Sequence, residues 1–362
     1  MAPVLSRQTL NRALLSRQLL LSRADISVHD AVAHLYGLQA QAPNPPYVAL
    51  WNRLDGFAPG ELSELIVDRR AVRIALMRGT IHLVTADDYR RLRPLLGPVF
   101  ERGFATTYGR RLPGLDFDAV AAHGRTLVEE QPRTFAELGV VLAERFPGHD
   151  PEALAQVVRA RVPLVQVPPR GLWGSSGQAA HTSAESWLGE GSVVAALDDM
   201  VLRYLAVYGP ASVKDVQAWS GLTRLKEVVE RLRPGLAVFR DEHGVELFDL
   251  PDAPRPEPGV PAPVRLLGEF DNILLSYADR TRIISEEHRR RVFTVNGIIR
   301  STVLIGGFVA GMWRVERTRG QAVLAVEPFT AFSAADRDAV TREGARLLAF
   351  TDPDAAHDVR IG

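Results

Sequence analysis

The segment PASVKDVQAWSGLTRLKEVVERL, residues 210–232, determines the architecture that we expect. Ser212 is a suitable N-cap for a first helix, Gly221 supplies a turn, and Thr223 is expected to cap a second helix. Two short apolar runs within 236–248, separated by Glu-His-Gly, predict a β-hairpin. A helix-turn-helix followed by a hairpin is the order of a winged helix, so this segment predicts one.

The same order of helices and hairpin occurs twice earlier in the chain. Apolar runs on either side of Arg78-Gly79 predict a hairpin over 72–84, and a long connecting helix is expected over 86–108. A second pair of strands is expected within 164–182. We therefore predict an α+β, mainly helical protein with three tandem winged-helix units, over residues 1–115, 116–190 and 191–252.

The pattern changes after a proline-rich linker, DAPRPEPGVPAP, at 252–263. Asn296-Gly297 and Gly306-Gly307 are strong signals for short turns between strands. Ser333 is expected to cap a last helix that ends near Phe350. Residues 253–362 thus predict a small β-rich region, which we expect to be barrel-like.

Composition excludes several classes of site. The 362 residues contain no cysteine, so disulfides, thiolate metal sites and cysteine nucleophiles are excluded. The net charge is zero. The arginine-rich start lacks the pattern of a signal peptide, and the most apolar stretch, 303–313, is too short to span a bilayer. We expect a cytoplasmic protein with no membrane contact and no obligate protein partner.

The polar pair Gln39-Ala-Gln41 stands at the predicted end of a helix that starts near Val28, just before Pro43. Amide side chains donate and accept hydrogen bonds without titrating, so a pair can orient a water molecule. His34 and His82 lack the spacing of metal ligands, and no phosphate-binding glycine motif is present. We therefore predict neither a metal nor a cofactor.

Four segments carry a resemblance to a known family: LYGLQAQAPNPPYVALWNRL, ALMRGTIHLV, LGEFDNILLSYADRTRII and NGIIRSTVLIGGFVAGMWR. In this order, and over essentially the whole chain, the sequence resembles the bacterial AlkZ-type DNA glycosylases. These are tandem winged-helix proteins with a concave DNA-binding surface, and they include azinomycin-resistance enzymes. The resemblance implies that Gln39 and Gln41 form the family's catalytic Gln-x-Gln motif. Glutamine rather than aspartate at the second position resembles the self-resistance branch.

The resemblance implies a monofunctional DNA glycosylase that hydrolyses the N-glycosidic bond of bulky N7- or N3-alkylpurines. Interstrand crosslinks made by a DNA-alkylating natural product are a further expected substrate. The expected partner is double-stranded DNA that carries alkylated purines. Candidates for lining the DNA surface are basic residues in or near the quoted segments, each with an ion pair or strand-end contact as the alternative role: Arg78, His82, Arg280, Arg282 and Arg314.

Two other functions use the same fold. A winged-helix transcriptional regulator would read a specific sequence with a recognition helix, for which 223–232 is the best candidate. A non-enzymatic damage-binding or scaffold protein would keep the DNA surface without turnover. Release of a base from alkylated DNA by the purified protein separates both alternatives from a glycosylase.

Overall fold

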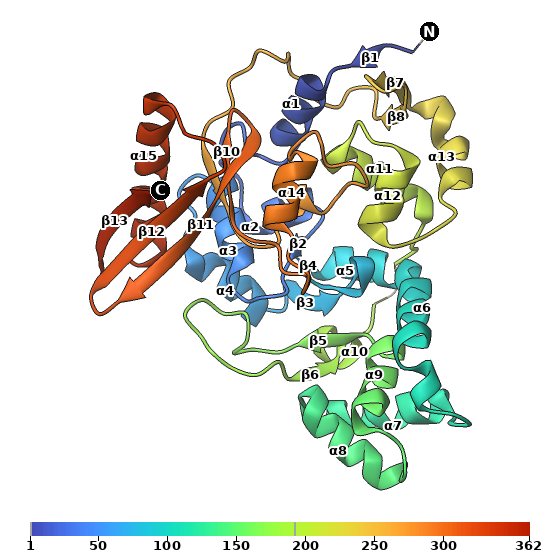
Figure 1. The fold of residues 1–362 in the computed structure, drawn as a ribbon. Helices are drawn as coiled ribbons and strands as arrows, with labels where there is room; N and C mark the ends of the chain where they lie inside the picture. The colour runs from blue at the N-terminus through green and yellow to red at the C-terminus, as the bar shows by residue number, and fades with distance from the viewer. Residues whose placement is uncertain (1, 192) are drawn as a thin grey trace.

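A five-stranded antiparallel sheet lies at the middle of the computed structural model, which describes residues 2–191 and 193–362 (Figure 1). Its order is β2-β4-β3-β5-β6, formed by Leu38–Gln39, Ile81–Thr85, Ala71–Ala75, Leu164–Gln166 and His181–Ser183. Strands β3 and β4 form the hairpin predicted over 72–84. β3 also pairs with β5, so the hairpins of the first two predicted units share one sheet. The division of the chain into units stays a prediction.

The N-terminal segment contains four helices: α1 (Arg7–Arg17), α2 (Val28–His34), α3 (Pro45–Arg53) and α4 (Pro59–Val67). α2, α3 and α4 contact this sheet, whereas α1 packs against the helix Leu197–Tyr208. The Ser27 hydroxyl caps α2, as its position before an apolar run predicts. The prediction that a helix continues from Val28 to the glutamine pair is wrong. Tyr36 and Gly37 have φ of +56° and +92°, which ends the helix, and Gln39 lies in strand β2.

The long helix predicted over 86–108 is also wrong, because prolines interrupt it. The chain forms α5 (Ala86–Leu92), the 3₁₀ turn η2 (Arg93–Leu96), α6 (Gly97–Thr107) and η3 (Gly109–Arg111). Pro94 and Pro98 each lie in the first turn of a new element. Proline lacks the N–H that a helix interior needs but suits a first turn, so each proline restarts the helix instead of continuing it.

A lower lobe in Figure 1 contains α7 (Phe117–Glu130), α8 (Phe135–Arg145), α9 (Pro151–Arg161) and α10 (Ala184–Leu188). The two later of the longer helices, α8 and α9, begin at capping residues. Thr134 and Glu137 form a capping box at the start of α8, and Asp150 accepts hydrogen bonds from the first turn of α9. These local signals are enough to define where each helix begins, because each capping residue directly precedes an amphipathic run.

The third segment contains α11 (Leu197–Tyr208), α12 (Val213–Ser220), α13 (Lys226–Leu232), η4 (Arg233–Gly235) and the hairpin β7 (Ala237–Asp241) to β8 (Glu246–Asp249). Ser212 caps α12, and Gly221 ends it with φ +80°. Thr223 does not cap α13, contrary to prediction: the helix begins later, and the Gln217 side chain accepts from the Leu225 N–H at 3.0 Å. Strand β1 (Val4–Leu5) pairs in parallel with β7.

The C-terminal region forms an open five-stranded sheet, and the expected barrel is not present among the described residues. Its order is β13-β12-β11-β10-β9, formed by Ala356–Ile361, Gln321–Pro328, Phe308–Thr318, Thr302–Ile305 and Arg265–Leu267. Between β9 and β10 the chain forms η5 (Asn272–Leu274) and α14 (Glu286–Val292), and between β12 and β13 it forms α15 (Ala334–Thr351). Ser333 caps α15, as predicted.

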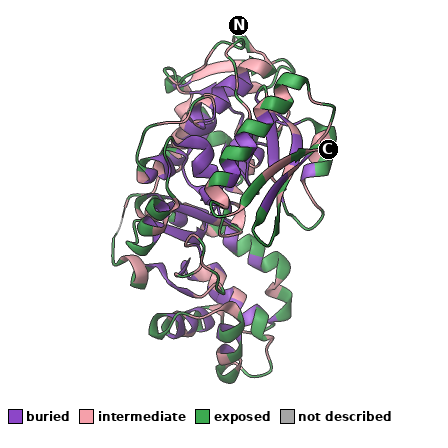
Figure 2. Cartoon of the chain, turned by 90° about the vertical axis from the view of Figure 1, so that its left-hand side faces the viewer, coloured by how far each residue is buried: buried purple, intermediate pink, exposed green. Residues whose placement is uncertain are grey.

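Two hydrophobic cores join these parts, and Figure 2 shows their buried residues in the middle of the molecule. In one core, α3 packs against the C-terminal sheet and α15, where the Trp51 and Phe350 rings stack at 6.0 Å. Among the described residues, no helix is both long and apolar enough to cross a membrane.

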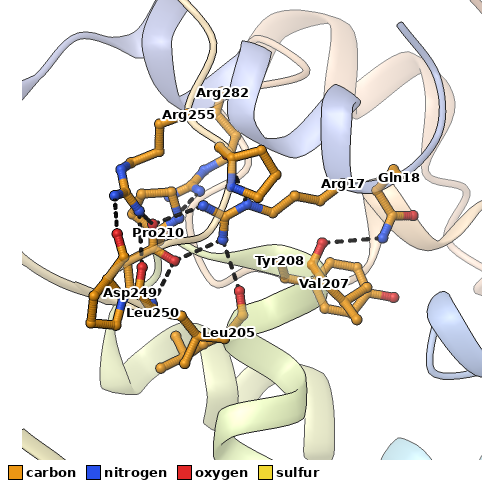
Figure 3. A network of polar contacts seen from close by, with 12 residues as sticks. Arg17, Gln18, Leu205, Val207, Tyr208, Pro210, Asp249, Leu250, Arg255 and Arg282 are labelled. Atoms are coloured by element: carbon orange, nitrogen blue, oxygen red, sulfur yellow. Dashed lines mark hydrogen bonds and ion pairs between the residues drawn. The ribbon is translucent and has the colours of Figure 1, made fainter. Parts of the chain in front are cut away.

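A buried charge cluster ties the N-terminal helix to the third segment. Figure 3 shows Arg17 and Arg255 converging on Asp249, with Arg17 bidentate at 2.7 and 2.8 Å and Arg255 at 2.6 Å. Arg17 also donates to the Leu205 carbonyl at 2.9 Å. Because a buried carboxylate without partners is costly, these contacts fix α1, β8 and the linker relative to one another.

Candidate active site

The segment that carries the two glutamines begins along the edge of β4: Gln39 is the last residue of β2, and Gln41 lies in the bend that follows. Gln39 is opposite His82 in the antiparallel pair, and the Ala40 N–H donates to the Ile81 carbonyl at 2.8 Å. The side chains of both glutamines reach the β3–β4 hairpin, Gln39 at the Arg78 guanidinium and Gln41 at the Ile81 N–H. These contacts, and not a fraying helix end, bring the pair to the hairpin.

Both glutamine side chains are held by their amide oxygens. Gln39 is 6% exposed, and its Oε1 accepts from Arg78 Nη2 at 2.6 Å. Gln41 is exposed, and its Oε1 accepts from the Ile81 N–H at 2.7 Å. An amide oxygen has two lone pairs, so each retains one, and each Nε2 keeps its N–H donors. The pair is thus oriented while acceptors and donors remain for a ligand.

Arg78 is positioned by an unusual backbone conformation in the β3–β4 turn. Its φ is +57°, and its Nη1 donates to the Trp219 carbonyl on α12 at 2.6 Å. Burial lowers the pKa of Arg78 to about 10, and the nearby Arg280 charge adds to this effect, so Arg78 remains a cation at neutral pH. The predicted DNA-binding residue Arg78 thus contacts the predicted catalytic Gln39 directly.

His82 is a neutral, buried histidine. It is 2% exposed, and its Nδ1 lies 2.9 Å from the Thr80 carbonyl oxygen. A carbonyl only accepts, so Nδ1 carries the proton and Nε2 is the acceptor. Burial lowers the His82 pKa to about 3, with a further contribution from the Arg78 charge. His82 therefore offers no positive charge to a phosphate near neutral pH.

Sequence reasoning missed Asn272, which clamps the glutamine segment, and Asp271, which ties the same loop to α3. Asn272 accepts from the Gln39 N–H at 3.0 Å and donates to the Gly37 carbonyl at 2.6 Å. Its neighbour Asp271 forms a buried bidentate ion pair with Arg53 at 2.8 and 2.9 Å. The available signal was a polar Asp-Asn pair within a largely apolar stretch of the segment 264–277.

A further arginine supports the segment from below. Arg73 on β3 is buried, donates to the Ala40 carbonyl at 2.8 Å, and reaches Gln166 Oε1 on β5 at 3.3 Å. Burial lowers the Arg73 pKa to about 10. The glutamine segment is therefore held from the clamp, from β4 and from β3, which is the rigidity that a preorganised site needs.

A cleft of about 790 Å³ lies between the start of α3, the β5–β6 loop and the C-terminal sheet, and its lining includes neither Gln39 nor Gln41. One wall begins at Asn44, three residues after Gln41, and another includes Glu269, three residues before Asn272. The opposite side is formed by Trp173 from the β5–β6 loop and by β11 of the C-terminal sheet. Burial raises the pKa of the Glu269 carboxyl. The cleft has the volume of a small-molecule site and is larger than a single base requires.

The other predicted DNA-binding residues lie in different environments. Arg314 on β11 is exposed, lines the cleft and pairs with Glu316. Arg280 is half-buried over the Phe293 ring at 5.0 Å, and its Nε has no hydrogen-bond partner among the described residues. Arg282 is buried and donates to the Pro210 carbonyl at 2.7 Å, so its geometry supports a structural role and gives no support to a phosphate contact.

Comparisons with known proteins agree over nearly the whole chain. A curated relative from Streptomyces sahachiroi, described as an interstrand DNA cross-link repair glycosylase, is 24% identical over 352 residues, covering 92% of this chain and 93% of the relative. The solved structure of Streptomyces sahachiroi DNA glycosylase AlkZ matches with a TM-score of 0.78 at 22% identity, covering 99% of this chain and 100% of that one. That likeness shows a shared fold.

The family model described as DNA glycosylase AlkZ-like matches residues 32–350, which contain the glutamine pair, its clamp and the cleft. A match of this extent establishes membership and, with it, an enzyme that acts on N-glycosyl bonds in DNA. This protein belongs to the DNA glycosylase AlkZ-like family.

Proposed function

We propose that this glycosylase hydrolyses the N-glycosidic bond of bulky N7- or N3-alkylated purines, including interstrand crosslinks, in double-stranded DNA. The observation that carries the proposal is the anchored pair Gln39 and Gln41, and a large open cleft begins at Asn44, three residues further along the chain. An open cleft accommodates an adduct that is too large to be flipped into a close-fitting pocket. The curated relative is itself described as a crosslink repair enzyme, which supports this substrate class.

The chemistry suits groups that do not titrate. An N7- or N3-alkylated purine carries positive charge and leaves readily, so the bond from C1′ to the ring nitrogen breaks with its electron pair going to the base. The base becomes neutral, positive charge develops on the sugar, and a water oxygen bonds to C1′ and loses a proton. Gln39 and Gln41 would place that water and stabilise the sugar cation through their free oxygen lone pairs. The product is an abasic site.

The test is base excision by Gln39→Ala and Gln41→Ala variants on alkylated duplex DNA. Each should lower the excision rate at least about tenfold, which corresponds to about 1.4 kcal/mol of transition-state stabilisation. DNA affinity should change little, because phosphate contacts dominate it. Wild-type rates in both folded variants would contradict the assignment of these residues.

The same proposal includes a monofunctional enzyme. Strand-cutting glycosylases use an amine that forms a Schiff base with the sugar. The two lysines of the chain, Lys214 and Lys226, lie on α12 and α13, and the N-terminal amine is outside the described residues. Borohydride added during turnover should therefore trap no covalent protein–DNA adduct, and trapping would disprove hydrolysis by water.

The regulator alternative is not favoured, because the family is enzymatic. The helix that would read bases, α13, is only Lys226–Leu232, and its Arg231 is paired with Asp198 on α11.

A further inference from the structure

The cleft between the start of α3, the β5–β6 loop and β11 has aromatic walls that are fixed in place. Trp173 lines it from the loop, and its ring packs against Tyr47 at 4.9 Å and Phe350 at 5.2 Å. Trp313 lines it from β11, and its Nε1–H donates to the Leu267 carbonyl at 2.9 Å. Aromatic side chains that are ordered before binding suit the stacking of a planar ligand, and every nucleobase is planar.

One carboxylate in the lining has no partner among the described residues. The Glu269 side chain forms neither a hydrogen bond nor an ion pair there, and partial burial raises its pKa without a neighbouring donor to offset the effect. The other acidic residue of the lining, Glu327, is paired with Arg291 at 2.7 Å. Glu269 is therefore available to accept hydrogen bonds from a ligand.

The positive charges of the lining are largely neutralised. Arg314 pairs with Glu316, and Arg317 pairs with Asp352. Arg300 is exposed and forms no ion pair with any residue in 2–191 and 193–362. One free guanidinium in the same cleft as one free carboxylate suits a nucleotide, because the phosphate is an anion and the base donates hydrogen bonds.

The loop that carries Glu269 is packed against α3 and tied to the glutamine segment. A Cβ added at Gly268 would lie 3.3 Å from Val48 Cβ on α3, so the backbone approaches the helix closely. Phe270 has φ +58°, a conformation that residues other than glycine rarely adopt. Two residues further along, Asn272 clamps the glutamine segment. The position of the carboxylate is thus fixed relative to the candidate active site.

A carboxylate matches one nucleobase better than the others. Guanine presents two donors side by side on its Watson–Crick edge, the N1–H and the N2 amino group, and a carboxylate accepts from both at once. Adenine and cytosine each present one donor beside an acceptor, and thymine presents one donor between two acceptors. In a duplex the guanine edge is paired with cytosine, so a carboxylate reads only a guanine that has left the stack.

An adduct at N7 leaves that edge free. N7 lies on the opposite side of the purine from N1 and N2, so a substituent there points away from the carboxylate. The cleft of about 790 Å³ exceeds the volume of a base and leaves room for the substituent. Alkylation at N7 also gives the purine a positive charge, which makes its N1–H a stronger donor to a carboxylate.

We propose that the cleft is a guanine-binding site in which Trp173 and Trp313 stack on the base and Glu269 accepts from its Watson–Crick edge. The site selects N7-alkylguanine over N3-alkyladenine, and this inference rests on the function proposed above. The Cα atoms of Asn44, in the wall, and Gln41 lie at most about 11 Å apart, because three residues of chain reach no further. The sugar of a bound guanine therefore stays close to the glutamine segment.

The experiment exchanges the hydrogen-bonding pattern of the carboxylate. In Glu269→Gln the side chain offers one acceptor beside one donor, which matches the Watson–Crick edge of adenine instead of guanine. Glu130→Gln is the matched control, because Glu130 is exposed at the end of α7 and lies outside the cleft lining. The substrate is duplex DNA treated with an aromatic nitrogen mustard, which alkylates guanine at N7 and adenine at N3. Mass spectrometry measures each released base, after subtraction of its spontaneous loss.

The ratio of guanine-adduct to adenine-adduct release should fall at least about tenfold in Glu269→Gln, because a bidentate contact to the base is exchanged. The ratio should be the same in Glu130→Gln as in the wild type. An unchanged ratio in Glu269→Gln would overturn the guanine site.

Nucleotide binding separates this inference from the assignment of the glutamines. Quenching of tryptophan fluorescence measures the affinities for 7-methylguanosine 5′-monophosphate and adenosine 5′-monophosphate. Wild type, Glu130→Gln and Gln39→Ala should prefer the guanine nucleotide, and Glu269→Gln should lose that preference. This measurement also decides the case in which Glu269→Gln releases neither base.

The two proposals therefore fail separately. If Gln39→Ala excises normally and Glu269→Gln loses the preference for guanine, the guanine site stands and the assignment of Gln39 fails. If Gln39→Ala abolishes excision and the preference of Glu269→Gln equals that of the wild type, the glutamine site stands and the guanine site is wrong.

Discussion

Asn272 shows how a single distant residue positions the glutamine segment. Its side chain accepts a hydrogen bond from the Gln39 N–H and donates one to the Gly37 carbonyl, and both residues are buried. Asn272→Ala should lower the free energy of unfolding by about 1–3 kcal/mol, because both backbone groups lose their partner. The excision rate should fall through kcat more than through KM, since the segment loses its position while the phosphate contacts persist.

Asn272→Asp is the matched variant, because a carboxylate still accepts from the Gln39 N–H but cannot donate to the Gly37 carbonyl. The kcat of Asn272→Asp should lie between the kcat of the wild type and that of Asn272→Ala. Urea unfolding and single-turnover excision measure the two effects. Equal kcat in all three proteins would show that the clamp does not position the glutamines.

His82 makes stability depend on pH. Its pKa is lowered from 6.5 to about 3 in the folded protein. Between these values the unfolded chain binds a proton that the native protein does not, so the free energy of unfolding falls as the pH falls through this window. His82→Gln removes this contribution, and relative to that variant the wild type should lose about 2 kcal/mol between pH 7 and pH 5. Urea unfolding of both proteins at the two pH values measures the difference.

The contributions of other titrating groups to the pH dependence of stability cancel when the two proteins are compared. His181, whose pKa burial lowers to about 4, is present in both proteins. A difference between wild type and His82→Gln that does not change with pH would mean that the imidazole is solvated and not buried.

At the scale of elements, the end of α12 packs against the turn that carries Arg78. A Cβ added at Gly221 would lie 3.2 Å from the Arg78 Cα and from Val99 Cγ1, and the residue has φ +80°. Gly221→Ala should therefore destabilise the protein and displace Arg78, which lowers excision. Gly244→Ala is the control: its φ is +79°, and no heavy atom lies within 4 Å of its added Cβ.

Both glycine variants incur the cost of a left-handed alanine, about 1–2 kcal/mol. Any further decrease in the free energy of unfolding of Gly221→Ala measures the clash with the turn that carries Arg78. The excision rate should fall in that variant alone. Thermal unfolding and excision rates are the measurements. Equal decreases in stability and in excision rate in the two variants would show that the turn shifts without displacing Arg78.

The elements that sequence predicts well are those set by local signals. Ser212 and Gly221 bound α12 because a cap and a left-handed glycine act within a few residues. The same logic, applied to Gly37, would have ended α2 before the glutamines. The prolines that follow favour a later helix end, so the sequence prediction extends the helix into residues that form strand β2.

The parts of the site that sequence does not predict depend on long-range contacts. Gln39 and Gln41 were identified from a family resemblance, and their assignment stays a proposal. Asn272 and Asp271 meet the glutamine segment and Arg53 only in the folded chain, more than two hundred residues away in sequence. The burial of Arg282 also cannot be predicted from the sequence, because arginine clusters are common along the chain.

At the scale of the whole molecule, the net charge is zero, but phosphate binding depends on the local charge where arginines converge and not on the total. Affinity for duplex DNA should fall at least about tenfold between about 50 and 200 mM salt and depend little on base sequence. Fluorescence anisotropy over a salt series measures this. A protected footprint at one specific operator, bound more tightly than alkylated DNA, would contradict the prediction.

The sheet shared through β3 and β5 limits how pieces of this family can be recombined. A chimera that joined the first 115 residues of this chain to the rest of a relative would pair β3 of this chain with β5 of the relative, two strands that did not evolve together. Arg73 would face a foreign β5, although it reaches both Gln166 and the Ala40 carbonyl in the native chain. Donor segments for grafting substrate preference should therefore extend through Ser183, the last residue of β6, so that the whole sheet is inherited intact.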